Sequence, residues 1–171
     1  MTAASPSSAA EPTDDTRKVA DLIKSAGRIA MLTTRAPDGT LMSRPMALQE
    51  VEFDGDLWFF ADAGSRKVAH VSADPQVNVA VGAASTWVSL TGGATVVRDL
   101  QKKRELWSKV VEAWLPQGPE DPSVVLVKVD GDTAEYWDSP GNRLATALSF
   151  VKAKATGSQP STGEKDVVDL P

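Results

Sequence analysis

The stretch Leu57–His70 has the sequence LWFFADAGSRKVAH. Its aromatic and apolar residues at the beginning predict a strand, and the Ala-Gly-Ser sequence that follows predicts a tight turn. The residues after this turn predict the start of a helix. Ser65 stands at the N-cap position of that helix, and two cations, Arg66 and Lys67, follow it. Because a helix begins with unpaired N–H groups and a positive dipole end, two added cations oppose the dipole unless an anion is bound there. The pattern therefore predicts a phosphate site, with a solvated basic turn at the start of a surface helix as the alternative.

The composition limits the classes of protein to which the chain can belong. With 171 residues, 42% hydrophobic and 24% charged, it is expected to form one globular domain with a core of its own. It has no cysteine and one histidine, which excludes disulfides, thiolate chemistry and histidine metal clusters, so no metal site is expected. A net charge of −5 argues against nucleic-acid binding. No apolar run suits a membrane span or a signal core, and a cytoplasmic protein is expected.

The distribution of small, polar and proline residues divides the chain into three parts. It predicts a disordered segment over residues 1–14, a folded domain over 15–150 and a flexible tail over 151–171. Within the domain, a helix capped by Asp14 or Asp15 is expected to end at Gly27. A second helix is expected after the basic turn. A third, capped by Asp99, has an apolar face formed by Leu100, Leu106, Trp107, Val110 and Val111.

The remaining periodic segments predict strands joined mostly by tight turns. These strands cover residues 28–34, 40–51, 57–61, 77–81, 87–97, 124–129 and 133–137, with a turn at 130–132 between the last two. Gly92 and Gly93 fall inside a strand and indicate a bulge or a close backbone approach. The order differs from repeated βαβ units, and no Gly-x-Gly-x-x-Gly follows a strand, so a Rossmann fold is disfavoured. A mainly-β fold is expected, with an antiparallel, Greek-key-like sheet closed into a small barrel and peripheral helices.

Three blocks of sequence resemble a known family. They are SRPM at 43–46, the stretch 59–67, and EYW at 135–137 continued by NRL at 142–144. Together they resemble the FMN-binding split β-barrel proteins of the pyridoxamine 5′-phosphate oxidase-like superfamily, in the general stress protein branch. The resemblance extends from about Asp14 to Leu144. It implies a homodimer that binds FMN noncovalently at the subunit interface, with FAD or the deazaflavin F420 as alternative cofactors.

The resemblance also implies roles for individual residues at the phosphate end of the flavin. Arg66 and Lys67 would bind the phosphate, Arg44 would reach the phosphate or the ribityl chain, and Ser65 could donate to the phosphate. The neighbouring Pro45 suggests a strand edge that a ligand can approach. For Arg44, the alternative is a side chain that faces solvent.

A second group of residues is implied at the flavin ring. The backbone of Met46, Phe60 and Ala61 would line the isoalloxazine edge. Trp87 would lie beside the ring, and Trp137 would contact it from the partner chain. Arg143 would lie near the flavin face. Packing in the core or at the dimer interface is the alternative for the two tryptophans. The single histidine, His70, is expected to be a partly exposed structural residue, with a catalytic role as the alternative.

The departures from the family pattern concern the substrate. Gln49, Ala145 and Ala147 stand where the oxidases carry a lysine, a histidine and an arginine. The chain is thus expected to keep the cofactor phosphate site, to lack the substrate phosphate site and not to oxidise pyridoxamine phosphate. No residue is an evident general acid or base, so any turnover would pass through the flavin. A flavin-dependent oxidoreductase, an F420-dependent enzyme on the same barrel and a non-enzymatic flavin-sequestering stress protein all remain open.

Overall fold

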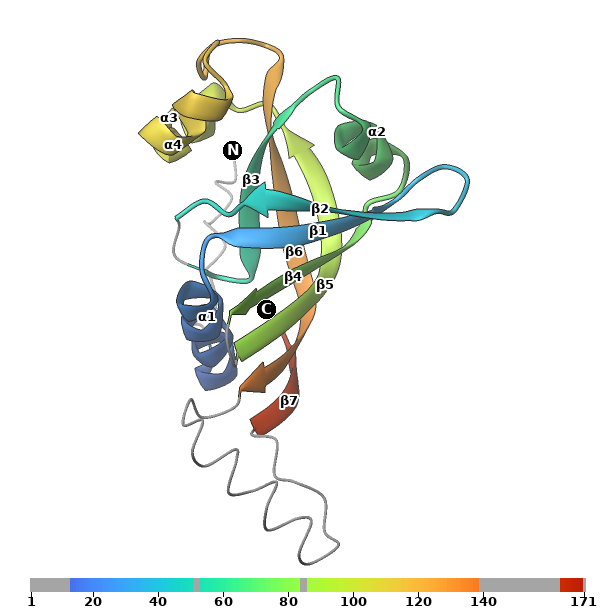
Figure 1. Cartoon of the computed structure of the whole chain (residues 1–171), viewed down its shortest axis with the longest axis vertical. Coiled ribbons are helices and arrows are strands. Elements are labelled where there is room, and N and C mark those ends of the chain that lie inside the picture. The colour runs from blue at the N-terminus through green and yellow to red at the C-terminus, as the bar shows by residue number, and fades with distance from the viewer. Residues whose placement is uncertain (1–12, 51–52, 84–85, 139–163, 171) are drawn as a thin grey trace, which may run out of the picture.

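The computed structural model describes residues 13–50, 53–83, 86–138 and 164–170 (Figure 1). The elements follow in the order α1 (Asp14–Ala26), β1 (Ile29–Arg35), β2 (Leu41–Ala47), β3 (Asp56–Asp62), α2 (Arg66–Ala73), β4 (Gln76–Ala83), β5 (Thr86–Val97), α3 (Leu100–Leu106), α4 (Lys109–Trp114), β6 (Val124–Asp138) and β7 (Glu164–Asp169). No helix of these residues is long and apolar enough to cross a membrane.

The strands form one antiparallel sheet in the order β2-β1-β4-β5-β6-β3, with β7 paired to β6. The two ends of this order, β2 and β3, meet at a single bridge between Leu48 and Phe59. Beside it, the N–H of Gln49 donates to the carbonyl of Trp58 at 3.0 Å. Elsewhere the facing edges of β2 and β3 are not paired with each other, so the barrel is closed at one point and split along the rest. The expected mainly-β, antiparallel split barrel is confirmed.

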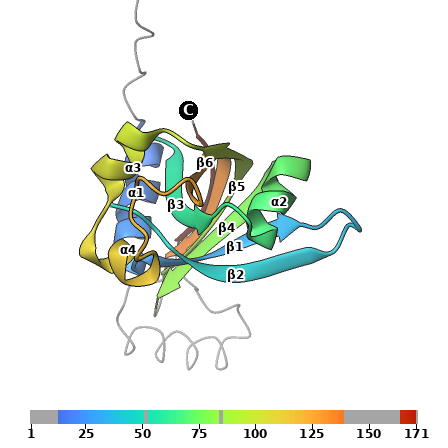
Figure 2. The same ribbon diagram turned by 90° about the horizontal axis from the view of Figure 1, so that it is seen from above.

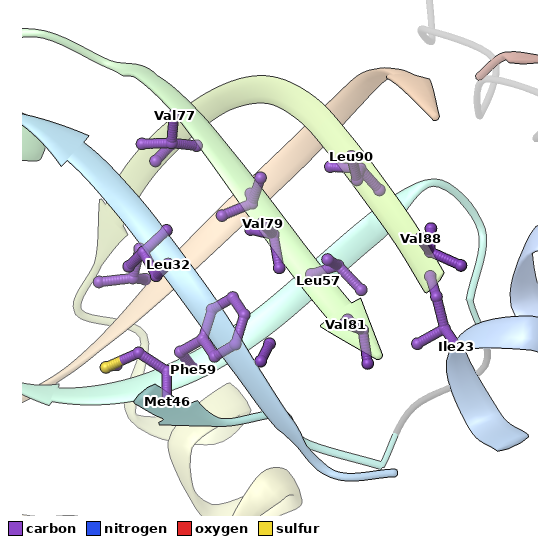
Figure 3. Close-up of a cluster of buried hydrophobic side chains, with 14 of the residues drawn as sticks. Ile23, Leu32, Met46, Leu57, Phe59, Val77, Val79, Val81, Val88 and Leu90 are labelled. Carbon is purple, nitrogen blue, oxygen red and sulfur yellow. The ribbon is translucent and has the colours of Figure 1, made fainter. Parts of the chain in front are cut away.

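Alternation along the strands places the core inside this barrel. Leu32, Phe59 and Val79 are each fully buried, and Figure 3 shows them gathered from β1, β3 and β4. Burying a side chain of this size contributes about 1.5–3 kcal/mol. The helix α1 covers one end, where Ile23 reaches the core, and α2 packs against β1 and β5 near the other end. Seen from above, α2 and the α3–α4 pair lie on opposite sides of the barrel (Figure 2).

Two predictions about the helices need correction. The N-cap of α1 is Thr13, whose hydroxyl oxygen accepts from the N–H of Thr16 at 3.2 Å. Asp14 and Asp15 lie in the first turn of the helix, where their negative charges interact favourably with the positive end of the helix dipole. The helix ends at Gly27, which has a φ of 104°. The predicted helix after Asp99 is two helices, because Trp107 adopts an extended backbone and the hydroxyl of Ser108 accepts from the N–H of Val111.

The predicted apolar face of that helix is only partly confirmed. Leu106 and Val111 are buried, but Leu100 and Val110 are exposed. The break between α3 and α4 changes the helical phase, so Val110 does not share a face with Leu106.

The predicted turn at 130–132 is wrong, because β6 continues through it as a single strand of 15 residues. The register with β5 shifts there: Thr91 pairs with Thr133, whereas Gly92 pairs with Gly131. A Cβ on Gly92 would come within 1.9 Å of the carbonyl oxygen of Asp130, which confirms the close backbone approach predicted at this glycine. Glycine on both strands lets the chain form a bulge instead of reversing.

The predicted flexible tail is also wrong in part. Residues 164–169 form β7, and Val168 is buried against the core with an exposed fraction of 5%. Residues 151–163 lie outside the described part of the chain, as do residues 1–12, so the structure places only the last two residues of the predicted N-terminal segment, at the start of α1.

Candidate functional site

Three cationic side chains lie close enough to interact electrostatically, and we call them the cation cluster: Arg44 on β2, with Arg66 and Lys67 at the start of α2. Burial, and next the charge of Arg66, lower the pKa of Arg44. Burial and the charge of Arg44 lower the pKa of Lys67, against a smaller opposite effect of Asp62. In the described part of the chain, none of the three forms an ion pair with a carboxylate within 4.0 Å. Among the residues described, the cluster is therefore a concentration of positive charge that the nearby Asp62 only partly offsets.

The turn before α2 is held by Asp62. Its carboxylate accepts from the N–H of Gly64 at 2.7 Å, and its carbonyl accepts from the N–H of Ser65 at 3.1 Å. The hydroxyl of Ser65 also donates to this carbonyl, at 2.6 Å, and makes no cap bond to the helix. Ser65 thus has the extended backbone of an N-cap, but its hydroxyl hydrogen is already used. To donate to a phosphate, this hydroxyl would have to leave the Asp62 carbonyl, and that role stays a prediction.

The first turn of α2 leaves donors open beside the cluster. The N–H groups of Val68 and Ala69 are paired with the carbonyl of Ser65. For the N–H groups of Arg66 and Lys67, no acceptor is found among the residues described. Two open N–H groups, the positive end of the helix dipole and three cationic side chains all favour an anion at this position.

Arg44 is held by groups that the sequence analysis did not single out. Its Nη1 donates to Oγ1 of Thr34 at 2.9 Å and to the carbonyl of Leu32 at 3.5 Å. Thr34 is 1% exposed and also contacts His70, which is 6% exposed. The prediction that His70 is partly exposed is therefore wrong, because the side chain points from α2 into the barrel. Strand alternation could have revealed Thr34, since it places this hydroxyl on the inward face with Leu32.

The predicted ring-side residues of β2 and β3 lie along the open edges of the split. Met46 and Ala61 point into the core, whereas Pro45 is exposed on the outer face of β2. Phe60 is half-buried, and Trp107 packs edge-on against its ring with centroids 5.2 Å apart. Beyond the Leu48–Phe59 bridge, β2 and β3 are not paired with each other, so the backbone groups on their facing edges can contact a bound ligand.

The two predicted tryptophans form a separate group on the outer face of the sheet. Trp87 lies directly opposite Trp137, which in turn lies opposite Lys165, whose Nζ is 5.2 Å from the centroid of the Trp137 ring. Arg44 is on β2, and the sheet order β2-β1-β4-β5 places it three strands from Trp87. At about 4.8 Å per strand this separates them by about 14 Å across the sheet, and Trp87 lies on the outer face, so one protomer does not bring the tryptophans to the cation cluster. Arg143 lies outside the described residues.

A cavity of about 870 Å³ opens elsewhere, between α1 and the segment that joins β2 to β3. Its lining mixes cations and acids, including Arg17, Asp21, Lys24 and Glu50, and contains none of the predicted site residues. Among the residues described, no group of three or more His, Asp or Glu side chains is placed to hold a metal ion. The cation cluster is therefore the candidate site.

Comparison with known proteins agrees with the fold and with the sequence resemblance. The family described as "Pyridoxamine 5'-phosphate oxidase like" matches residues 14–161. Protein bli-3 of Neurospora crassa is 31% identical over 163 residues, which cover 87% of this chain and 78% of that protein.

Two solved structures are similar over most of the chain. A candidate general stress protein 26 from Jannaschia sp. CCS1 is 26% identical, with a TM-score of 0.73 over 92% of this chain and 99% of that one. The general stress FMN/FAD binding protein from Xanthomonas citri is 27% identical, with a TM-score of 0.65 over 76% of this chain and 93% of that one. From its sequence and its split barrel, the chain belongs to the pyridoxamine 5′-phosphate oxidase-like family.

Proposed function

We propose that this protein binds FMN, with the flavin phosphate held by the cation cluster. The observation that carries the proposal is the group formed by Arg44, Arg66 and Lys67, which has no carboxylate partner in the described structure and lies beside two open helix N–H groups. A phosphate monoester carries about two negative charges at neutral pH and several acceptor oxygens, so it complements this arrangement. The similar Xanthomonas citri protein, described as FMN/FAD binding, supports a flavin.

The terminal phosphate favours FMN over FAD as the ligand. In FAD the two phosphates are joined by an anhydride and carry one charge each, so its negative charge is spread over two groups instead of being concentrated on one terminal phosphate. Bound flavin would supply hydride or electron transfer, which is the chemistry of a flavin-dependent oxidoreductase. The residues of this chain would hold the phosphate and present the open edges of β2 and β3 to the ring.

Flavin fluorescence titrations with FMN and riboflavin test the phosphate site. Replacing Arg66 and Lys67 by alanine removes charge-assisted bonds worth about 1.5–3 kcal/mol each, so FMN should bind at least about a hundredfold more weakly. Riboflavin, which lacks the phosphate, should lose little affinity. Replacing the exposed Arg17 and Lys24 of α1 by alanine removes the same charge far from the site and serves as the control. Equal FMN affinity in the two double variants would contradict the proposal.

The proposal includes a homodimer, because the outer face of the sheet carries exposed apolar side chains. Ile29, Met31 and Trp87 are exposed by 60%, 40% and 55%. In the ladder, Met31 lies between Pro45 of β2 and Ala80 of β4, so these residues form one surface rather than isolated side chains. A second copy on this surface would bury it and could bring its own Trp137 to the flavin of its partner.

Sedimentation velocity tests this part of the proposal. The wild type is expected at about twice the chain mass of 18.1 kDa. Replacing Met31 by glutamate should yield a monomer, because a dimer would bury its charge in an apolar interface. Val110 is equally apolar and 61% exposed on α4, so its replacement by glutamate should leave the dimer intact. A monomeric wild type that still binds FMN would overturn the dimer.

A further inference from the structure

We infer that Thr34 and His70 are positioning residues that fix Arg44 in place for the phosphate. The inference rests on the proposed flavin site and concerns residues to which neither the sequence pattern nor the family resemblance assigned a role at the phosphate. It is carried by a continuous hydrogen-bonded relay that joins three elements of the fold.

The relay consists of two contacts to a single hydroxyl. Nη1 of Arg44 on β2 donates to Oγ1 of Thr34 on β1 at 2.9 Å, and the same Oγ1 lies 3.0 Å from Nδ1 of His70 on α2. Thr34 and His70 are 1% and 6% exposed, so water does not compete for these bonds. Arg44, at the other end of the relay, is only half-buried.

The chemistry of the three groups sets the direction of the bonds. A guanidinium can only donate, so Oγ1 of Thr34 is the acceptor. The hydroxyl hydrogen of Thr34 then needs an acceptor of its own, and Nδ1 of His70 is the one that the described structure offers. If Nδ1 were the donor, a buried hydroxyl hydrogen would remain unpaired. The relay therefore runs from Arg44 through Thr34 to an unprotonated Nδ1, and the hydrogen of the imidazole is on Nε2.

This arrangement counters the repulsion within the cation cluster. The charge of Arg66 acts on Arg44, and the charge of Arg44 acts on Lys67, so without an anion the like charges repel Arg44. His70 follows Arg66 by one helical turn on α2, so the relay links Arg44 to the same helix that carries the other two cations. The three cations are thus assembled before the phosphate arrives, which lowers the ordering cost of binding.

The test compares FMN with riboflavin in variants of the relay. Thr34→Val keeps the shape of the side chain and removes the hydroxyl. It should weaken FMN binding about tenfold, the loss of one hydrogen bond to a charged group, while riboflavin affinity stays within about twofold. His70→Leu should have the same effect. Thr34→Ser and His70→Asn, whose amide oxygen can replace Nδ1 as the acceptor, should restore most of the FMN affinity.

A second readout needs no flavin. Inorganic phosphate at millimolar concentration should raise the melting temperature of the wild type and of Thr34→Ser, but less so that of Thr34→Val. An equal loss of FMN and riboflavin affinity in Thr34→Val would indicate a merely structural role and overturn the inference. Unchanged FMN affinity in that variant would overturn it too. A wild type that binds FMN no tighter than riboflavin would instead refute the phosphate site itself, and the inference with it.

Discussion

The indole of Trp87 lies against the backbone of Gly82, its direct partner in the β4–β5 ladder. A Cβ built on Gly82 would come within 2.1 Å of Cε3 of the ring, so no other residue type fits without moving the indole. Although Trp87 is 55% exposed, its ring is thus held flat across the neighbouring strand. The glycine sets the shape of the outer surface at which we propose that a second copy binds.

We expect Gly82→Ala to displace the indole of Trp87. Overpacking of this kind costs about 1–3 kcal/mol, so the melting temperature should fall and the tryptophan fluorescence should shift. Gly93→Ala is the matched control, because a Cβ on Gly93 meets nothing within 4 Å. Equal melting temperatures and spectra in the two variants would show that the close contact has no consequence.

We expect the C-terminal strand β7 to contribute to the stability of the barrel. Val168 is 5% exposed and Val167, its neighbour on the opposite face, is 60% exposed. Val168→Ala should lower the free energy of unfolding by about 1–3 kcal/mol, since it removes buried methyl groups and leaves a cavity. Val167→Ala should change it by less than about 0.5 kcal/mol. Urea unfolding measures both, and two equally small effects would argue that β7 does not pack in solution.

The ammonium of Lys128 lies between two carboxylates, 2.7 Å from Asp56 and also paired with Asp130. Burial opposes its charge, but the hydrogen bonds to Asp130 and Asp56 outweigh this effect and raise the pKa of Lys128. A cation whose pKa is raised by folding stabilises the protein fully below its unfolded pKa. That contribution is lost as the pH rises through the folded pKa.

We therefore expect Lys128→Met to lower the free energy of unfolding at pH 7 by about 1 kcal/mol, a modest value because solvent screens part of the pair. The deficit should shrink above about pH 10.4, the ordinary pKa of a lysine, as the wild type loses its own ammonium charge. Urea unfolding at pH 7 and at pH 11 measures the difference. The exposed Lys109 provides the control, since Lys109→Met should have little effect at either pH. A deficit that does not depend on pH would mean that packing, not charge, is responsible.

We expect negligible oxidation of pyridoxamine phosphate, even with flavin bound. Gln49 stands where the resemblance implies a substrate-binding lysine. Its side chain is an uncharged amide, which donates to the carbonyl of Ala47 at 3.0 Å, so it offers no positive charge to a substrate phosphate. A missing ion pair to the substrate phosphate costs a few kcal/mol, which lowers turnover by orders of magnitude. Steady-state peroxide release measures it. A rate of about one per second would place the protein among ordinary enzymes for this substrate and contradict the prediction.

The sequence by itself determined the features that depend on neighbouring residues. The strand, turn and basic helix start at 57–70 are found as predicted, because apolar alternation, a Gly-Ser turn and helix propensity are all local. Gly92 was identified as a close approach for the same reason. The sequence also sufficed for the family and the class of fold, since the matching blocks are continuous segments. The prediction of one helix after Asp99 was wrong at Trp107–Ser108. There the cap formed by Ser108 starts a new helix, although the apolar pattern continues across the break.

The tertiary structure alone decided which distant residues meet. Thr34 and His70 are 36 positions apart, and only the packing of α2 against β1 makes them partners. The pairing of β7 with β6 and the bulge in β6 depend likewise on the register of long strands, where burial of one face outweighs a local turn signal. The cation cluster depends on both the sequence and the tertiary structure. Arg66 and Lys67 are adjacent in the sequence, whereas Arg44 comes close to them only through the packing of the barrel. Like charges so placed repel one another, so it is the packed barrel that holds them together and forms the candidate site.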